Sequence, residues 1–378
     1  MKVLVVKSNY GKIGGPETLL ASIQNRMDRD EFECTLLALS HDAQKPLPFL
    51  DAQSFEKQPE KFQLIHWKGL TSLPRGILQL LKLIKNTKPD VIYTHDMRAN
   101  MVAFLASFFT PILWVAHVHG WLGKTAILKT RIFEWIDQRL VRRAQRVLVG
   151  SEYLKKQMRE LHGISRVEVV PNFLDWEAFQ KTPPLDIHRK PLFPDFDGLV
   201  IGTASRLHPG KGIHVLIQAF ARLVKIIPDV RCLIVGEGPE KARLQQLARD
   251  LGIEDRVVFT GYVEEVLPYL RSTQIYVLAS FQESLPVSLL EALALGKPAI
   301  GTDVGDVGRV LDFGKEHLLV PPGDVNRLYH ALVHLCQNPL LQKSLGEKGS
   351  EAVKQNYSLS VAIEKIQSVI REVGDQKK

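Results

Sequence analysis

Apolar segments of strand length alternate with amphipathic helical segments in two successive series, and this alternation limits the possible folds more than any other feature. The first series opens with an apolar run at residues 2–7, a glycine-bearing loop at 11–15 and a helical pattern from Glu17 onward. A strand, a glycine loop and a helix make the opening unit of a doubly wound α/β domain. Two such series predict two α/β domains with parallel sheets and a central cleft.

The remaining elements follow from apolar runs and helical spacing. In the first series we expect strands at residues 33–39, 91–94, 112–118, 146–149 and 167–170, and helices at 76–85, 100–109 and 125–143. In the second we expect strands at 199–203, 231–235, 257–260, 275–279 and 298–301, and helices at 214–226, 241–251 and 287–295. The length of 378 residues fits two domains.

A proline-rich stretch separates the two series. Residues 181–197 lack periodicity and carry four prolines, so we interpret them as a linker between a first domain at 1–180 and a second at 198–357. The apolar stripe within 358–373 recurs at helical spacing. It predicts a last helix that crosses back to the first domain.

The sequence favours a cytoplasmic protein. The apolar run at 101–118 is broken by Pro111, and the run at 3–6 is too short for a secretory signal. Cys34, Cys232 and Cys336 lie far apart, which excludes a disulfide framework and a cysteine zinc site.

The net charge of +8 is concentrated in the first half of the chain. Residues 1–180 hold 25 Lys and Arg against 18 Asp and Glu, whereas residues 181–378 hold 24 against 23. This asymmetry indicates either an anionic partner for the first domain or ordinary surface variation. The basic, partly amphipathic segments 78–88 and 124–146 could dock on anionic lipid, or they could be ordinary helices covering a sheet.

The loop at residues 206–212 carries two cations and two glycines directly after an expected strand. Ligands of open α/β sheets bind at the carboxyl ends of strands. Arg206 and Lys211, with glycines that allow close backbone approach, suit a diphosphate. Gly212 stands where a Walker A loop needs Ser or Thr, so the loop is not of that type. The plain alternative is a pair of solvated loop charges.

Two carboxylates flank the start of a second expected helix. Glu283 precedes the helix and Glu291 lies about one and a half turns into it, with Pro286 expected in the first turn. The free N–H groups of that turn favour an anion. Two carboxylates at this spacing can bind hydroxyls at two ends of one polar ligand. The plain alternative, which spacing alone favours, is a capping carboxylate and a solvated or salt-bridged helix glutamate.

Taken in order, the motifs resemble the retaining GT-B glycosyltransferases of family GT4. The second half contributes Arg206-Leu-x-x-x-Lys-Gly212, Val235-Gly-Glu-Gly-Pro239, Phe259-Thr-Gly-Tyr262, Glu283-x7-Glu291 and Gly296-Lys-Pro298. The first half contributes Gly14-Gly15-Pro-Glu17, Ala116-His-Val-His-Gly120, Gly150-Ser-Glu152 and Val170-Pro-Asn172. The resemblance covers nearly the whole chain.

The resemblance implies transfer of a sugar, with retention of its anomeric configuration, from a UDP- or GDP-linked sugar to an acceptor hydroxyl. The first domain would take the acceptor and the second the donor. Cell-surface glycan, polysaccharide or glycolipid synthesis is the implied setting, without nucleic acid. The two acids of Asp195-Phe-Asp197 precede their expected strand and lie in the linker, so we do not interpret them as a metal site. The resemblance implies no metal or cofactor. The departing diphosphate itself would remove the acceptor's proton.

The same resemblance implies roles for individual residues. Arg206 and Lys211 would grip the diphosphate, Glu291 the ribose, and Gly261 and Tyr262 the base. Glu283 and neighbouring backbone groups would bind the transferred sugar.

Two histidines of the first domain have open roles. His119 would contact the sugar as a catalytic-site residue, although a packed histidine is the alternative. His95 is open between a structural and an acceptor-facing role. The remaining donor-binding positions implied are Gly15, Ser284, Leu285, Pro286 and Val287.

The chain departs from the family pattern within residues 305–309. Asp306 stands in place of a second glycine and Arg309 in place of an acid, which puts the local donor contacts in doubt. Two other functions stay open. A sugar-nucleotide epimerase or hydrolase of the same fold would consume donor without acceptor, and a non-catalytic sugar-nucleotide or glycan-binding module would show no turnover.

Overall fold

The computed structural model describes residues 1–9, 27, 30–40, 62–66, 70–119, 128–176, 179, 196–314 and 318–377. They form two compact units, Met1–Pro171 together with Leu359–Lys378, and Asn172–Ser358. Of the expected linker only residues 196 and 197 are described, so its extent stays a prediction.

The first unit contains a seven-stranded parallel sheet in the order β3-β2-β1-β4-β5-β6-β7. Its strands are β1 (Lys2–Asn9), β2 (Glu33–Ser40), β3 (Phe62–His66), β4 (Val91–Thr94), β5 (Trp114–Val118), β6 (Arg146–Val149) and β7 (Val167–Val169). Its helices are α3 (Leu73–Thr87), α4 (Met97–Ala106), α5 (Leu128–Leu140), α6 (Glu152–His162) and α16 (Leu359–Asp375). The strand order reverses between β1 and β4, which is the position where doubly wound sheets bind ligands.

Alternating strand residues bury both faces of this sheet. Leu4, Ile92 and Trp114 lie in one core cluster with residues of α3 and α4, because every second strand residue points to the same face. Helix α4 packs between α3 and α5. Helix α16 contacts β4 and β5. A side chain added at Gly374 of α16 would meet Val91 of β4. Val91 points to the face opposite to that of its neighbour Ile92, so α16 covers this second face.

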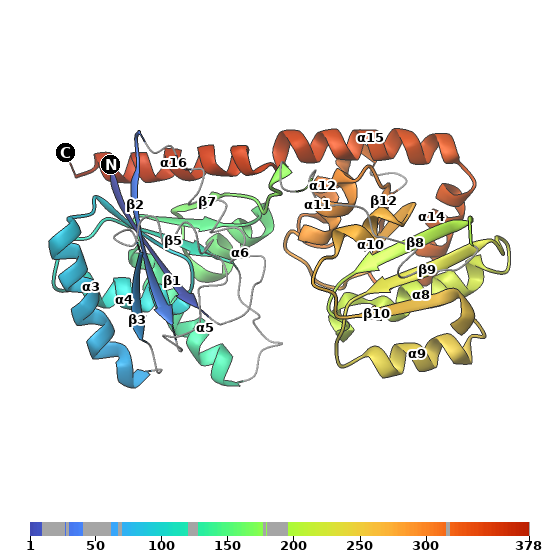
Figure 1. Ribbon diagram of the computed structural model, residues 1–378, viewed down its shortest axis with the longest axis horizontal. Helices are drawn as coiled ribbons and strands as arrows, with labels where there is room; N and C mark the ends of the chain where they lie inside the picture. Colours follow the sequence, from blue (N-terminus) through green and yellow to red (C-terminus); the bar gives the residue numbers. More distant parts are fainter. Residues whose placement is uncertain are drawn as a thin grey trace. The chain divides into compact units, whose positions relative to one another are not determined.

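The last helix is held to the first unit by packing and by charge. Ile366 and Ile370 on α16 are fully buried. Arg371 forms a two-pronged ion pair with Glu31 at 2.6 Å for each bond. The sequence stripe therefore predicted both the helix and its apolar face, and Figure 1 shows α16 lying along the sheet that contains β5.

The second unit repeats the doubly wound plan with a six-stranded parallel sheet, in the order β10-β9-β8-β11-β12-β13. Its strands are β8 (Leu199–Ala204), β9 (Val230–Val235), β10 (Val257–Gly261), β11 (Ile275–Leu278), β12 (Ala299–Thr302) and β13 (Leu319–Val320). Its helices are α8 (Ile213–Leu223), α9 (Lys241–Asp250), α10 (Leu267–Arg271), α11 (Val287–Ala294), α12 (Val307–Val310), α14 (Val325–Cys336) and α15 (Pro339–Asn356).

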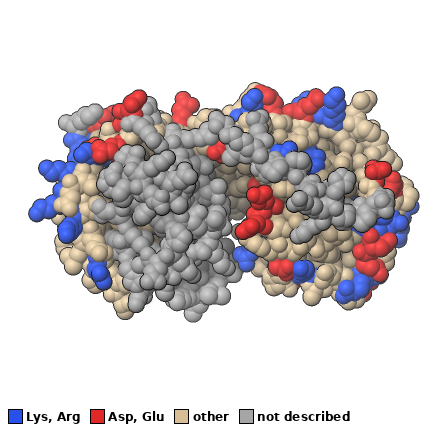
Figure 2. Space-filling model, viewed as in Figure 1, with Lys and Arg blue, Asp and Glu red and all other residues tan. Residues whose placement is uncertain are grey.

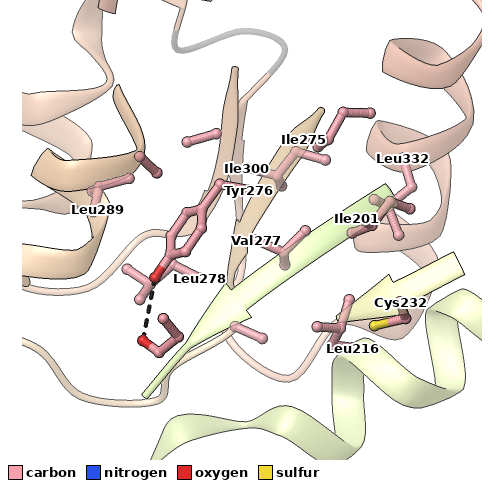
Figure 3. Packing of buried hydrophobic residues seen from close by; sticks show 14 of the residues in the cluster. Ile201, Leu216, Cys232, Ile275, Tyr276, Val277, Leu278, Leu289, Ile300 and Leu332 are labelled. Atoms are coloured by element: carbon pink, nitrogen blue, oxygen red, sulfur yellow. Dashed lines mark hydrogen bonds between the residues drawn. The ribbon is translucent and has the colours of Figure 1, made fainter. Parts of the chain in front are cut away.

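Strands β11 and β12 of this sheet are buried along their whole length. Tyr276, Val277 and Ile300 are among the fully enclosed residues of the core, and Figure 3 shows Tyr276 between Leu278 and the side of α11 that carries Leu289. Burial on both faces explains why these strands read as continuous apolar runs. The order reverses between β8 and β11, so the loops after these strands meet at one edge.

Most of the expected elements are confirmed within one to three residues, including β4 and β6 at their expected bounds. The expected helix at 100–109 begins earlier, at Met97, because the Asp96 side chain accepts hydrogen bonds from the N–H groups of Arg98 and Ala99 and caps it there. Pro286 is the N-cap of α11 and not, as expected, a residue of its first turn. None of the described helices is long and apolar enough to span a membrane.

We predict that Ile366→Ala lowers the free energy of unfolding of the first unit by about 2–4 kcal/mol, because it opens a cavity under α16. Differential scanning calorimetry measures the loss. Lys365→Ala, one position away on the exposed side of the helix, should change it by less than about 0.5 kcal/mol. Equal losses in both variants would contradict this packing.

Candidate functional site

The loops that follow β8 and β11 meet where the strand order of the second unit reverses. The Phe281 N–H donates to the Gly210 carbonyl at 2.8 Å. Gly212 has φ +62°, and a Cβ there would lie 2.0 Å from the carbonyl oxygen of Ala279. Only glycine fits that conformation and that approach. The glycine thus brings the two loops into direct backbone contact.

An ion pair joins these two loops through their side chains. Lys211 Nζ lies 2.7 Å from Glu283 Oε1, and the Ser280 hydroxyl donates to the same oxygen at 2.7 Å. The Glu283 side chain is 10% exposed and that of Lys211 30%. The cation and the acid that the sequence predicted as ligand groups therefore lie side by side, with the cation the more accessible of the two.

The loop after β12 fixes the backbone beside Glu283. Gly305 has φ +55°, and a Cβ there would lie 2.3 Å from the Glu283 carbonyl oxygen. The Asp306 N–H donates to the Ser284 carbonyl at 2.9 Å, and the Asn172 amide donates to the Leu285 carbonyl at 2.7 Å. Asp306 supports the loop through its backbone N–H, which the glycine of the family pattern would also supply.

The second carboxylate lies on the same helix that starts beside Glu283. Glu291 is half-buried, and burial raises the pKa of its carboxyl to about 7. Burial also raises the pKa of Tyr276, and the charges of Glu283 and Glu291 both add to that shift. The Tyr276 hydroxyl donates to Ser288 Oγ at 2.8 Å. The negative charges of both carboxylates therefore disfavour ionisation of the same buried phenol, that of Tyr276.

The other sequence-predicted residues of this unit lie on neighbouring loops. Arg206 is exposed on the loop after β8. Tyr262 follows β10 and is 78% exposed. The Leu207 N–H donates to the Glu237 carbonyl at 2.9 Å, and the Gly236 N–H donates to the Gly261 carbonyl at 3.1 Å. Backbone hydrogen bonds thus connect the loop after β8 to the loop after β9, and the loop after β9 to the end of β10, along one edge of the sheet.

Sequence reasoning missed three polar residues of this region. Ser280 bonds to Glu283, and Tyr276 and Ser288 bond to each other. Ser280 directly follows a predicted strand, and that position was the available signal. The partnership of Tyr276 with Ser288 depends on how α11 packs on β11, which no local pattern encodes.

In the first unit, His119 lies just after β5 and next to two other histidines. Tyr93 and His95 on or after β4, and His117 and His119 on or after β5, point to one face because β4 and β5 pair in parallel with Thr94 opposite Ala116. The Tyr93 hydroxyl and His117 Nδ1 are 2.8 Å apart. His95 is fully buried.

Burial holds these imidazoles in the neutral form. It lowers the pKa of His95 and of His117 well below the usual value, and it lowers the pKa of His119 to about 4. Lys7, itself buried and 3.6 Å from Asp96, lowers the pKa of His95 and His119 further. Gly15, the glycine expected beside the diphosphate, lies outside the described residues, as does Gly120.

Comparisons with known proteins agree with this architecture. The family model for "Glycosyltransferase Family 4" matches residues 13–178, and that for "Glycosyl transferases group 1" matches residues 198–338. The lipopolysaccharide core biosynthesis glycosyltransferase LpsE of Rhizobium meliloti is 31% identical over 94% of this chain and 95% of that protein. The N-acetyl-alpha-D-glucosaminyl L-malate synthase of Bacillus anthracis is 29% identical, but this chain spans only about half of its length, 54%.

A solved structure shares the whole two-unit fold. Anabaena HepE, determined in complex with UDP, superposes with a TM-score of 0.79 at 22% identity, covering 98% of this chain and 100% of that one. The α/β fold of GT-B type, with two Rossmann-like sheets, that the sequence predicted is therefore confirmed.

We predict that the free energy of unfolding of the second unit is higher in the Glu291→Gln variant than in the unaltered protein, by a margin that grows as pH rises. The unfolded carboxyl ionises near 4.5 and the folded one near 7, so the native state holds the extra proton between these values and loses stability as pH increases. The difference between the two proteins should widen by about 1–3 kcal/mol from pH 5 to pH 8.

Thermal unfolding at the two pH values measures this difference. Glu351→Gln, at an exposed position of α15, serves as the control and should show no such widening. A constant difference for Glu291→Gln across this range would mean that the Glu291 carboxyl is not desolvated.

Proposed function

The chain belongs to the family 4, or group 1, glycosyltransferases, and we propose that it transfers a sugar from a nucleotide-diphosphate sugar to an acceptor hydroxyl with retention of the anomeric configuration. The second unit would bind the donor and the first the acceptor. The observation that carries the proposal is the Lys211–Glu283 ion pair at the reversal of strand order.

The ion pair supplies the two kinds of group that such a transfer needs. As the bond between sugar and diphosphate breaks, negative charge grows on the leaving phosphate, and a fixed cation such as Lys211 stabilises it. Arg206 adds a second cation on the same loop. Glu283 accepts hydrogen bonds from hydroxyls of the transferred sugar. Before donor binds, Glu283 and Ser280 keep the lysine and its loop in position.

The nucleoside would occupy the loops after β10 and β11. Glu291 would bind the ribose hydroxyls, because an ionised carboxylate accepts two hydrogen bonds from neighbouring hydroxyls. Gly261 and Tyr262 would line the base. HepE has been solved with UDP-glucose, which supports a UDP-linked donor, with a GDP-linked one as the alternative. LpsE acts in lipopolysaccharide core synthesis, which supports a glycan or glycolipid acceptor.

The described residues of the second unit offer no side chain in the role of a covalent nucleophile. Lys211 and Ser280 both contact Oε1 of Glu283, and we assign this carboxylate to binding sugar hydroxyls and not to nucleophilic attack. We therefore assign removal of the acceptor's proton to the departing diphosphate, on the same face of the sugar, and we propose a reaction that needs no resident metal or cofactor. His119 would contact a sugar hydroxyl as a neutral imidazole. The cytoplasmic location expected from the sequence stays a prediction.

Peripheral membrane contact through the first unit is part of the proposal. Helix α3 exposes Leu78, Lys82 and Lys85 on its outer side, and Figure 2 shows lysine and arginine side chains gathered there. On α5, Trp135 is 53% exposed. The guanidinium carbon of Arg139 lies over its ring, 3.4 Å from the ring centroid. Basic and aromatic groups on one layer of helices suit an anionic lipid surface.

We predict that Lys211→Ala and Glu283→Ala each lower the rate of transfer by 100-fold or more, which corresponds to about 3 kcal/mol. A thermal-shift panel of UDP, GDP and their sugars first identifies the donor, since a ligand that binds the native state raises the melting temperature. Transfer of labelled sugar from that donor to a glycolipid or oligosaccharide extract then measures the rate.

Arg243→Ala is the matched control, because Arg243 forms a 2.7 Å ion pair with Glu240 on the surface of the same unit. Its rate should stay within about twofold of the original, since exposed pairs contribute little. Near-normal rates in both site variants would refute the site. Donor consumption without any acceptor would favour the epimerase or hydrolase, and nucleotide binding without turnover would favour a binding module.

We predict that Lys82→Ala/Lys85→Ala lowers binding to phosphatidylglycerol vesicles by about tenfold or more, since each lysine near an anionic surface contributes about 1 kcal/mol. Vesicle co-sedimentation measures the binding. Leu340→Ala, at an exposed apolar position of α15, should leave it unchanged. Equal binding of the unaltered protein to phosphatidylglycerol and phosphatidylcholine vesicles would contradict lipid docking by charge.

A further inference from the structure

Three histidines converge at the carboxyl ends of β4 and β5, and the proposed transfer uses only one of them. In His95, His117 and His119, one nitrogen from each ring lies within 4.8 Å of the others. The ring centroids are 4.5 Å apart for His117 and His119, 5.2 Å for His95 and His117, and 6.0 Å for His95 and His119. Three imidazoles so close together are a feature that needs its own explanation.

Several nitrogens of the cluster are buried without a hydrogen-bond partner. Among the described residues, neither Nδ1 nor Nε2 of His95 has a partner, and Nε2 of His119 has none. A buried polar atom left unsatisfied costs about 1–3 kcal/mol, and such atoms are rare in native proteins. The unpartnered atoms therefore point to a ligand that accepts lone pairs from several imidazoles together.

We propose that His95, His117 and His119 bind one divalent transition-metal ion of the zinc class. Imidazole nitrogen is a preferred ligand of Zn²⁺, Co²⁺, Ni²⁺ and Cu²⁺. Three histidines form a site that keeps a fourth position open for water or another ligand. The cluster lies on the ends of two paired central strands, which hold the ring positions more firmly than a surface loop would.

A hydrogen bond selects the ligand nitrogen of His117. His117 Nδ1 is engaged by the Tyr93 hydroxyl at 2.8 Å, so its Nε2 is the ligand atom. With Nδ1 protonated, that bond runs from His117 to the Tyr93 oxygen, and a partner of this kind orients a metal-binding imidazole. His119 offers its unpartnered Nε2, and His95 offers either nitrogen.

The site needs only small side-chain movements to close on an ion. A Zn–N distance of about 2.0–2.1 Å places tetrahedral ligand nitrogens about 3.4 Å apart. The nitrogens here lie within 4.8 Å of one another, so ring rotations that shorten each spacing by no more than about 1.4 Å suffice. The neighbouring charges of Lys7 and Asp96 oppose each other, and repulsion from Lys7 makes the expected affinity moderate.

Metal binding has a consequence for the transfer reaction that rests on the proposed function. The ion occupies Nε2 of His119, which is then unable to contact the sugar. Zinc therefore inhibits transfer, and a chelator restores it. The binding itself does not depend on any enzymatic activity, so the two statements are tested separately.

The binding test uses the full-length protein, freed of metal with a chelator and titrated with Co²⁺ and then Zn²⁺. We expect one Co²⁺ per chain with the visible absorption of a tetrahedral or five-coordinate nitrogen site, displaced by an equivalent of Zn²⁺. His95→Gln and His117→Gln should each weaken binding at least tenfold. His330→Gln, at an exposed position of α14, is the matched control and should bind as the unaltered protein does.

Folding and function are separated by two further measurements. The melting temperature of each metal-free variant shows whether it folds, and Zn²⁺ should raise the melting temperature of the unaltered protein but not that of a folded His95→Gln or His117→Gln variant. Absence of stoichiometric Co²⁺ or Zn²⁺ binding, or unchanged binding in both variants, would overturn the proposal. Metal binding in a protein that transfers no sugar would overturn the proposed function instead.

Discussion

The 2.7 Å ion pair between Lys211 and Glu283 is the interaction on which the proposed chemistry of the second unit depends. It exists because the strand order reverses between β8 and β11, so that residues far apart in sequence emerge at one edge. Gly212 permits the backbone approach that brings the loops together. Glu283 is the largely buried partner of this pair and Lys211 the more accessible one, so in the proposed reaction the lysine can exchange part of that contact for a phosphate.

The first unit uses the same topological position for a different kind of chemistry. There the reversal between β1 and β4 brings Lys7, Asp96 and three neutral imidazoles together in a buried setting. The second unit gathers charged groups that remain partly accessible, whereas the first gathers neutral donor atoms. One fold plan thus provides an edge with accessible charged groups and an edge with buried imidazole nitrogens, and the side chains at the strand ends decide between them.

The sequence allowed the two doubly wound parallel sheets, most of their strands and helices, and the placement of Lys211 and Glu283 after two strands to be anticipated, because apolar period and chain order carry that information. Strand β3 was missed because Gln63 and His66 leave it without a continuous apolar run. Helix α6 was missed because only Leu154 and Met158 are buried on it, although its Ser151 cap was a usable signal. The raised pKa of Glu291 and the orphaned His95 nitrogens arise from tertiary burial, which no local pattern reports.

The first unit is built from two separate pieces of the chain, because α16 packs on β4 and β5 while residues 172–358 form the second unit. A ribosome therefore finishes the second unit before it has supplied the last helix of the first. Until α16 has been synthesised, the parts of β4 and β5 that it contacts stay uncovered and open to chaperones. Loss of α16 should thus destabilise the first unit, most of which is synthesised first, and leave the second unit folded.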